Sequence, residues 1–368
     1  MVSMYKKVLL VNEGGKEFTG WTTDDFNPTT GELIFNTAMT GFVEILSDPS
    51  YINQIITFTS SHIGNYGLSE EDFESEKPRV NGAIGNSFTE NPSSWRSEQS
   101  ITSWLNEYEI PYSGGFDVRS ITSYLRDFGS GMFAMGTDIK AKDLMDLLNK
   151  SVDIIGDNSA LTAGRGTYET ESMQEMIGIM DLGAKQSIVD VIEEKGFKTL
   201  LLNPEITADQ ILSMNLSGLV ISNGPGDPRA LSGVINTVND LIGKIPLFGI
   251  CLGHQILSLA CGLSVSKLNF GHHGSNHPVK VTGIKNALIT SQNHGFSVDF
   301  KDLKQEHSKY GSIEQYAVNL NDGSNEGISI WDSNAYSVQF HPESGPGTSD
   351  GLKLFDPFFE MIGKKIGV

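Results

Sequence analysis

Between Gln174 and Ile250 the sequence alternates short apolar runs with longer segments of helical periodicity. Strand-length and helix-length segments follow one another in the order 176–183, 184–196, 197–203, 207–215, 217–223, 230–244 and 245–250. Short apolar strands separated by amphipathic helices predict parallel βαβ units, with the sheet covered on both faces. This part of the chain is therefore expected to be an α/β domain with a mainly parallel sheet.

The N-terminal part has a different pattern. Residues 1–150 contain short apolar runs punctuated by glycine-rich turns, which predict a mostly β domain, with helices expected at 120–129 and 141–150. Residues 151–172 have weak periodicity and much Gly, Ser and Thr, which is typical of a linker. The expected organisation is an N-terminal domain at 1–150, a linker at 151–172 and the α/β domain at 173–368.

The charge balance excludes several classes of partner. Of the 368 residues, 45 are Asp or Glu and 26 are Lys or Arg, which gives a formal net charge of −19. Nucleic acids and anionic membranes require clustered basic residues, so we expect neither as a partner. The chain shows no apolar run long enough for a signal peptide or a membrane helix, and only Cys251 and Cys261 could form a disulfide. These features predict a cytoplasmic protein with free thiols.

Cys251 stands at a junction between a predicted strand and a predicted helix, within the sequence GICLG at 249–253. Glycines two residues before and after a nucleophile permit a sharp, strained strand-to-helix turn, as in the elbow of hydrolases. Backbone N–H groups and the positive end of the helix would favour a thiolate there. A buried structural cysteine is the alternative interpretation, and we prefer it for Cys261, which lies on an apolar helical face.

A nucleophilic cysteine requires a base, and His341 is the strongest candidate among eight histidines. A strand predicted at 335–340 should end at His341, at the carboxyl edge of the sheet, with Glu343 able to orient the imidazole. His254 follows Cys251 on the same helix and is expected to pack rather than react. The histidines of 270–278 could suggest a zinc site, but we do not expect one, because no cysteine or acidic cluster accompanies them with ligand spacing.

Attack on an amide produces an oxyanion, which backbone N–H groups must stabilise. Leu252, directly after the nucleophile, should supply one donor. A second should come from the loop SNGPGDP at 222–228, where Gly224 and Gly226 permit close approach of the backbone. Pro225 has no N–H, so the donor is one of these glycines, and Gly224 is favoured.

With these residues identified, the chain resembles the class I glutamine amidotransferases, whose nucleophile and base motifs are GICLGHQ and HPE. Over nearly its full length it is similar to the small-chain family of carbamoyl-phosphate synthetase. The segments that carry this closer resemblance include FNTAMTGFVEILSDPSY at 35–51, HIGNYG at 62–67, DVRSIT at 117–122, FGHHGSNHPV at 270–279 and SQNHGF at 291–296. Other amidotransferases do not begin in this way.

The resemblance implies that Cys251, His341 and Glu343 hydrolyse L-glutamine through a thioester. It further implies that ammonia passes through a tunnel to a large synthetase chain, in a heterodimer or a higher assembly that the N-terminal domain helps to form. That partner would use bicarbonate, ATP and Mg²⁺ to make carbamoyl phosphate for arginine and pyrimidine synthesis, whereas this chain would hold no cofactor and no metal. Glutamine-binding positions carried over from the family are Ser50, Gly224, Gly226, Leu252, Gln255, Asn293, Gly295 and Phe296.

Three residues depart from the family pattern. Leu182 and Ser187 replace the usual phenylalanine and asparagine, and Phe116 replaces the usual isoleucine. None of them belongs to the predicted triad, so we expect effects on packing or on partner contact rather than on chemistry.

Two other functions remain open from the residues alone. The chain could be a non-catalytic module that binds glutamine or a large partner without turnover, although the complete set of Cys251, His341 and Glu343 disfavours this. It could also be a stand-alone cysteine peptidase or γ-glutamyl hydrolase, for which the N-terminal domain would have no obvious role.

Overall fold

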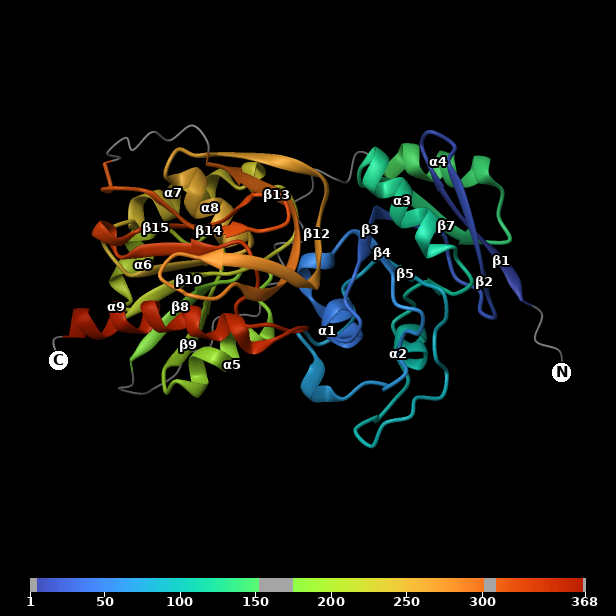
Figure 1. Ribbon diagram of the computed structural model, residues 1–368, viewed down its shortest axis with the longest axis horizontal. Helices are drawn as coiled ribbons and strands as arrows, with labels where there is room; N and C mark the ends of the chain where they lie inside the picture. The colour runs from blue at the N-terminus through green and yellow to red at the C-terminus, as the bar shows by residue number, and fades with distance from the viewer. Residues whose placement is uncertain (1–4, 152–174, 301–308, 367–368) are drawn as a thin grey trace. The chain divides into compact units, whose positions relative to one another are not determined.

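The computed structural model describes residues 5–151, 175–300 and 309–366. The chain divides into two compact units, residues 1–157 together with 269–274, and residues 158–268 together with 275–368. The linker expected at 151–172 lies outside the described residues, except for Ser151 at the end of a helix. Each unit has a sheet of its own (Figure 1).

The first unit contains a seven-stranded mixed sheet in the order β2-β1-β7-β3-β4-β5-β6. Strands β2, β1, β7 and β3 pair antiparallel, whereas β3, β4, β5 and β6 pair parallel. The β-rich N-terminal region predicted from the sequence is therefore confirmed. The strands are β1 (Lys6–Asn12), β2 (Glu17–Thr22), β3 (Thr29–Asn36), β4 (Gln54–Phe58), β5 (Gly82–Ile84), β6 (Tyr112–Ser113) and β7 (Gly131–Thr137).

Four α-helices and two short 3₁₀ segments complete the described part of this unit. The predicted helices at 120–129 and 141–150 are present as α3 and α4, and α3 buries Ile121 and Leu125 against the sheet. Phe116 packs in the same core, where an added Cβ on Gly20 would lie 2.3 Å from its ring. The elements are α1 (Phe42–Ser47), η1 (Pro49–Tyr51), η2 (Glu70–Asp72), α2 (Ile101–Glu107), α3 (Val118–Phe128) and α4 (Ala141–Ser151).

A short segment from the second half of the sequence belongs to the first unit. The N–H of Thr37 donates to the carbonyl of His273 at 3.2 Å, and the N–H of Ser130 donates to that of Asn269 at 2.8 Å. Phe270 packs on Phe35, with ring centroids 5.9 Å apart. The sequence pattern does not predict that residues 269–274 belong to the first unit, because the contacts join residues far apart in the chain.

The second unit contains a nine-stranded sheet in the order β13-β12-β14-β15-β16-β11-β10-β8-β9. The five neighbouring strands β16, β11, β10, β8 and β9 are parallel, as predicted. On the other side of the sheet, β12 pairs antiparallel with β14, β14 with β15, and β15 with β16. The strands are β8 (Met176–Met180), β9 (Lys198–Leu202), β10 (Gly218–Ile221), β11 (Leu247–Ile250), β12 (Ser264–Val281), β13 (Leu288–Asp299), β14 (Glu314–Asn319), β15 (Asn325–Ile330) and β16 (Ala335–Val338).

Helices cover both faces of the parallel strands. Alternate residues of β10 point to opposite faces, so Leu219 and Ile221 pack against α6, α7 and α8, while Val220 packs against α5 and α9. Figure 1 shows α7 and α8 on one side of the strands and α5 and α9 on the other. These helices are α5 (Gln186–Glu194), α6 (Ala208–Ser213), α7 (Ser232–Leu241), α8 (Leu252–Ala260) and α9 (Asp356–Ile366), with 3₁₀ segments η5 (Pro228–Ala230), η6 (Trp331–Ser333) and η7 (Ser349–Phe355).

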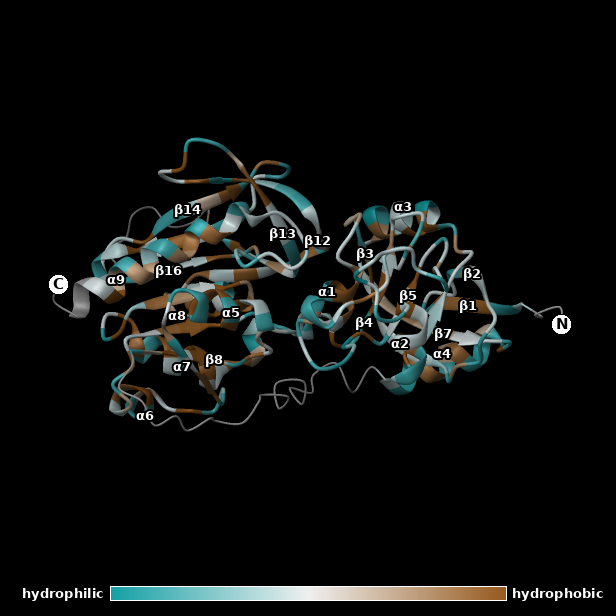
Figure 2. Ribbon diagram, turned by 90° about the horizontal axis from the view of Figure 1, so that it is seen from below, coloured by the Kyte–Doolittle hydropathy of each residue, from teal (hydrophilic) through white to brown (hydrophobic). Residues whose placement is uncertain are grey.

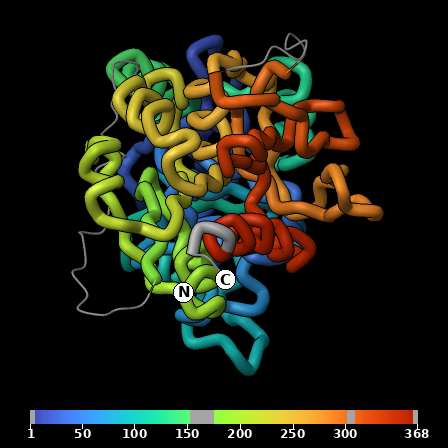
Figure 3. Tube along the Cα trace, turned by 90° about the vertical axis from the view of Figure 1, so that its left-hand side faces the viewer, coloured from blue at the N-terminus to red at the C-terminus, as the bar shows by residue number. Residues whose placement is uncertain are grey.

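The C-terminal helix α9 closes this core. Phe359 stacks on Phe197, with ring centroids 5.3 Å apart, and Phe358 is fully buried beside Phe248. Figure 3 shows the red α9 beside the green segment that opens the second unit, and Figure 2 shows brown, apolar residues gathered in β8 and its neighbouring strands. Within the described ranges, no helix combines the length and the apolar character that crossing a bilayer requires.

Candidate active site

Cys251 occupies the turn between β11 and α8. The strand ends at Ile250 and the helix begins at Leu252, so Cys251 is the N-cap residue of α8, with φ 54° and ψ −102°. Positive φ is strained for a residue with a side chain and costs on the order of 1–3 kcal/mol, a strain that native structures retain mainly at functional sites. The backbone N–H of Cys251 remains tied to the sheet by a 2.9 Å hydrogen bond to the carbonyl of Val338.

The two glycines of the elbow are required by close backbone contacts. A Cβ on Gly249 would lie 2.6 Å from the carbonyl oxygen of Gly253, and a Cβ on Gly253 would lie 2.0 Å from that of Ile221. Both distances are shorter than any real Cβ contact, so neither position accepts a side chain without movement of the backbone. The strained strand-to-helix turn predicted from the glycine spacing is confirmed.

His341 and Glu343 form a buried pair. Oε1 of Glu343 accepts a hydrogen bond from Nδ1 of His341 at 2.6 Å, and both side chains are at most 2% exposed. The strand β16 ends at Val338, so the expectation that it continues to His341 is wrong. Its parallel partner β11 ends at Ile250 and the chain then turns into α8, so the parallel ladder with β11 does not continue beyond Val338. His341 is held instead by a bridge to Ser291 on β13.

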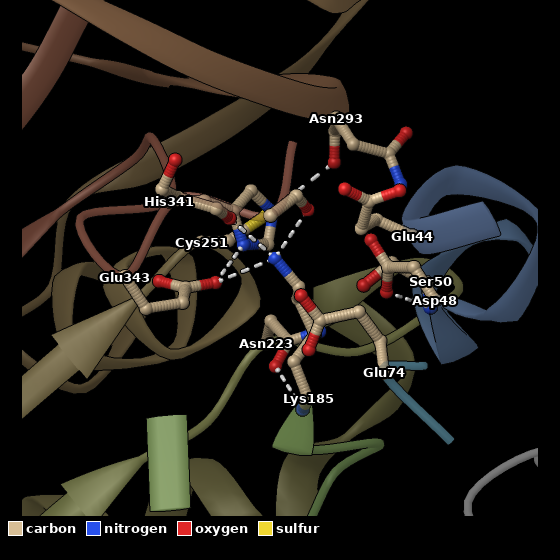
Figure 4. A network of polar contacts seen from close by, with 12 residues as sticks. Glu44, Asp48, Ser50, Glu74, Lys185, Asn223, Cys251, Asn293, His341 and Glu343 are labelled. Atoms are coloured by element: carbon tan, nitrogen blue, oxygen red, sulfur yellow. Dashed lines mark hydrogen bonds and ion pairs between the residues drawn. The ribbon is translucent and has the colours of Figure 1, made fainter. Parts of the chain in front are cut away.

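The structure brings the Cys251 thiol next to the imidazole of His341 (Figure 4). Burial by itself lowers the pKa of His341, but the charges of Glu343 and Cys251 and the hydrogen bonds to them raise it overall. Because Glu343 engages Nδ1, the other ring nitrogen is left for the thiol. This arrangement places a base beside the thiol, as nucleophilic catalysis by cysteine requires.

Lys185 is a member of this network that sequence reasoning missed. Its side chain is 1% exposed, and Nζ lies 3.1 Å from Oε1 of Glu343. The same amine donates to the carbonyls of Ser344 at 2.6 Å and Gly345 at 2.7 Å. The only signal in the sequence is a lysine in the short turn between an apolar strand and a helix, where a charge is not expected to be buried.

Opposing effects act on the pKa of Glu343. Burial raises it, but the nearby cation of Lys185 and the interaction with His341 outweigh burial and lower it. Glu343 is therefore an anion that holds His341 in one tautomer and orientation, which is the role of the third member of a catalytic triad.

The loop that follows β10 lies against the start of α8. A Cβ on Gly224 would lie 2.1 Å from the carbonyl oxygen of Leu182 and 3.0 Å from the side chain of Leu252, while Gly226 has φ +93°. Among the described residues, the N–H groups of Gly253, His254 and Gln255 all have backbone acceptors. The first N–H of α8, that of Leu252, has no acceptor within the helix and is the one positioned to bind an anion.

Asn223 and Ser222 hold this loop in place. The Asn223 amide oxygen accepts from the backbone N–H of Lys185 at 3.1 Å. The Ser222 hydroxyl accepts from the N–H of Leu182 at 3.0 Å and donates to the carbonyl of Asn223 at 2.8 Å. Lys185 therefore connects the loop of Gly224, through its backbone, with Glu343, through its side chain.

Four other predicted positions in the second unit gather around Cys251. The thiol donates to the carbonyl of Asn293 at 3.5 Å, and Nε2 of Gln255 donates to the carbonyl of Phe296 at 3.1 Å. Gly295 lies between Asn293 and Phe296 on β13 and has open space where a side chain would stand. Gln339, which the sequence reasoning also missed, donates from Nε2 to the sulfur at 3.7 Å.

Ser50 lies in the first unit, within η1. Its backbone N–H donates to Oδ1 of Asp48 at 2.8 Å, and both side chains are buried there (Figure 4). Asp48 is the N-cap of η1 and Pro49 starts the segment, so the turn that presents Ser50 is locally determined.

His254 and Cys261 behave as the sequence predicts. His254 is fully buried, Nδ1 lies 2.8 Å from the Ser337 hydroxyl, and burial lowers its pKa to about 3. Burial raises the pKa of the Cys261 thiol to about 12, and this residue packs against the apolar core of α7 and α8. A neutral imidazole and a protonated thiol in these positions contribute to packing.

Two family models match the chain. That of the carbamoyl-phosphate synthase small chain, CPSase domain, matches residues 10–135, and that of glutamine amidotransferase class-I matches residues 178–361. Among solved structures, a glutamine amidotransferase from Thermotoga maritima aligns with 54% of this chain and 87% of its own, at 17% identity and a TM-score of 0.36.

Curated relatives match over nearly the whole length. The carbamoyl phosphate synthase small chain of Bacillus caldolyticus is 39% identical over 96% of both chains. The pyrimidine-specific small chain of Bacillus subtilis is 38% identical over 96% of this chain and 95% of its own. The chain therefore belongs to the carbamoyl phosphate synthase small chain family and contains the class I glutamine amidotransferase domain of that enzyme.

Proposed function

We propose that this chain hydrolyses L-glutamine to L-glutamate and ammonia, with Cys251 as the nucleophile. The observation that carries the proposal is the strained Cys251 at the start of α8, with His341 beside it and Glu343 holding the ring. Membership of a glutamine amidotransferase family supports glutamine as the amide.

In the first half of the reaction, His341 takes the thiol proton and Sγ forms a bond to the side-chain amide carbon. The carbonyl oxygen becomes an oxyanion, to which the N–H of Leu252 and one N–H of the loop at Gly224 and Gly226 donate. The C–N bond then breaks as His341 gives its proton to the leaving nitrogen, releasing ammonia and leaving a glutamyl thioester.

In the second half, His341 removes a proton from water, whose oxygen attacks the thioester carbon. The C–S bond breaks, glutamate leaves, and the proton returns to Sγ. Glu343, with Lys185 behind it, stabilises the imidazolium that forms in each half.

Substrate would be held by Gln255, Asn293, Gly295 and Phe296 together with Leu252 and the loop at Gly224 and Gly226. Ser50 is proposed as a further glutamine ligand on the strength of the family motif. The hydrogen bond from the thiol to the Asn293 carbonyl, and the link from the Gln255 amide through Gln339 to the sulfur, support this set.

The ammonia would be consumed by a large chain, with which this chain forms a heterodimer or a higher assembly. In this scheme the large chain binds ATP and Mg²⁺ and uses bicarbonate to make carbamoyl phosphate, and ammonia reaches it through a tunnel. This chain needs no cofactor or metal of its own. The cytoplasm is the proposed location, and arginine and pyrimidine synthesis are the proposed destinations of the product.

The test compares the native chain with Cys251→Ser, with Cys261→Ser as the matched control, each reconstituted with the large chain. Cys251→Ser should lose glutamine hydrolysis and retain carbamoyl phosphate synthesis from added ammonia, whereas Cys261→Ser should retain both. A glutamyl adduct on the peptide that contains Cys251, trapped by acid quench and seen by mass spectrometry, identifies the thioester. Native glutamine turnover by Cys251→Ser would refute the proposal.

A further inference from the structure

Gln339 has no part in the chemistry described so far, yet it is one of the most enclosed polar residues of the second unit. It lies just beyond β16 and is 0% exposed. Its backbone N–H donates to the carbonyl of Glu326 at 2.8 Å, which continues the pairing with β15 for one more residue. The side chain is therefore held on a rigid sheet and leaves it close to the sulfur.

The orientation of the Gln339 amide follows from its neighbours. The carbonyl of Phe296 can only accept, so the Gln255 amide must turn its NH₂ group toward it, at 3.1 Å. That same NH₂ group lies 3.0 Å from the Gln339 amide, which must therefore present its oxygen. The Gln339 NH₂ group is then left facing Sγ of Cys251 at 3.7 Å.

The hydrogen bonds to the sulfur differ in what they favour. The Asn293 carbonyl accepts from the thiol at 3.5 Å and so favours the protonated form. An amide N–H can only donate to sulfur, and donation to a charged acceptor is stronger than donation to a neutral one. Gln339 thus favours the ionised sulfur.

We propose that Gln339 is a positioning residue that stabilises the Cys251 thiolate and links the nucleophile to the Gln255 amide. This inference rests on the proposed function for its biological meaning, because Gln255 is a substrate-binding position there. One NH₂ group of Gln255 donates to both the Phe296 carbonyl and the Gln339 oxygen. If substrate displaces Gln255, the Gln339 amide loses the hydrogen bond that holds its own NH₂ group toward the sulfur.

The experiment measures alkylation of the full chain by iodoacetamide between pH 5.5 and 9 and needs no glutamine turnover. Cys261 does not interfere, because burial raises the pKa of its thiol to about 12, and a Cys261→Ser background removes it altogether. The variants are Gln339→Met, which keeps the volume and loses the donor, and Gln339→Asn, whose shorter amide cannot reach the sulfur. Gln315→Met, on β14, is the matched control.

Gln339→Met is expected to slow alkylation at pH 7 about tenfold and to recover the native rate at high pH, where the sulfur is ionised without help. In the glutaminase assay its kcat should fall more than its KM changes. If thermal denaturation shows that Gln339→Met is not folded, Gln339→Asn replaces it and should show the same loss of alkylation rate at pH 7. Gln315→Met should match the pH profile of the native chain.

An unchanged pH profile in both Gln339 variants would overturn the inference, as would a loss of rate that is equal at every pH, which a purely structural role would produce. Failure of the proposed function has a separate signature, namely native glutamine hydrolysis by Cys251→Ser. The two results are independent, because alkylation reports on the sulfur and not on turnover.

Discussion

The amine of Lys185 and the imidazole of His341 contact the same carboxylate oxygen, Oε1 of Glu343, at 3.1 Å and 2.6 Å. A carboxylate buried with one cation is already costly, and a second cation would leave the group with a net positive charge. When His341 takes the proton of Cys251, the anion left on the sulfur supplies the missing negative charge. Four ionisable groups from three segments of the chain therefore balance one another in a buried part of the fold.

Replacing Lys185 by methionine tests this balance. Lys185→Met removes the cation that lowers the pKa of Glu343 and leaves the Ser344 and Gly345 carbonyls without their donor. We expect unfolding free energy to fall by about 3–5 kcal/mol, the usual cost of breaking a buried ion pair. Urea denaturation measures this loss, and glutamine hydrolysis should fall with it.

The matched control is Lys195→Met. Lys195 pairs with Asp356 at 3.5 Å, but both side chains are about half exposed. Such a pair contributes little, so we expect a change within about 0.5 kcal/mol. Equal stability of the two variants would show that the buried position of Lys185 has no energetic weight.

Acid should weaken the native state through Glu343. Its pKa is lower in the folded chain than the ordinary carboxyl value, so the folded state binds this proton less readily than the unfolded state does. This difference adds to the unfolding free energy at pH values above the ordinary carboxyl pKa. The added free energy is lost as the pH falls through the lowered pKa that Glu343 has in the folded chain. Urea denaturation at a series of pH values from 7 to 3 gives the unfolding free energy as a function of pH. This free energy should fall less steeply with decreasing pH in Glu343→Gln than in the native chain.

Glu343→Gln should also be less stable than the native chain at pH 7, because Lys185 and His341 then lose their shared anion. The difference in unfolding free energy between Glu343→Gln and the native chain should become smaller toward pH 3. If the two stability curves stay parallel over the whole range, Glu343 does not carry the acid dependence.

The elbow makes a sharp prediction at Gly253. A methyl group there would lie 2.0 Å from the carbonyl of Ile221, so Gly253→Ala must push α8 away from β10. We expect a loss of about 2–3 kcal/mol in unfolding free energy, typical of an overpacked core, together with a loss of glutaminase activity. Thermal unfolding and alkylation of Cys251 measure the two effects.

Gly233→Ala is the control for this experiment. Gly233 lies in α7 and an added Cβ meets nothing within 4 Å, so alanine should stabilise the helix by about 0.5–1 kcal/mol. A Gly253→Ala chain as stable and active as Gly233→Ala would contradict the close contact at the elbow.

Part of this architecture could be predicted from the sequence because its causes are local. The strands from β8 to β11 are short apolar runs bounded by helices, and each falls within the range expected for it. The elbow was predictable for a similar reason, since Gly249 and Gly253 mark a turn that only glycine permits.

Other parts depend on contacts that no local pattern reports. Lys185 meets Glu343, and Gln339 meets Cys251, only after the sheet has assembled, and both polar side chains are buried where sequence rules expect apolar ones. The same is true of residues 269–274, which join the first unit through pairings with distant segments. The end of β16 cannot be predicted from its own residues, because it depends on where its partner β11 stops.

The last prediction concerns the loop that faces the start of α8. In Gly224→Ala the new methyl group would lie 2.1 Å from the carbonyl of Leu182 and 3.0 Å from the side chain of Leu252, so the loop must shift from its position. If this loop supplies a donor to the oxyanion, kcat should fall about 10²- to 10³-fold. Alkylation of Cys251 by iodoacetamide should stay near the native rate, since the thiol, His341 and Glu343 are not displaced. Loss of alkylation together with turnover would instead mean that the substitution had disturbed the elbow, and native kcat would remove this loop from the mechanism.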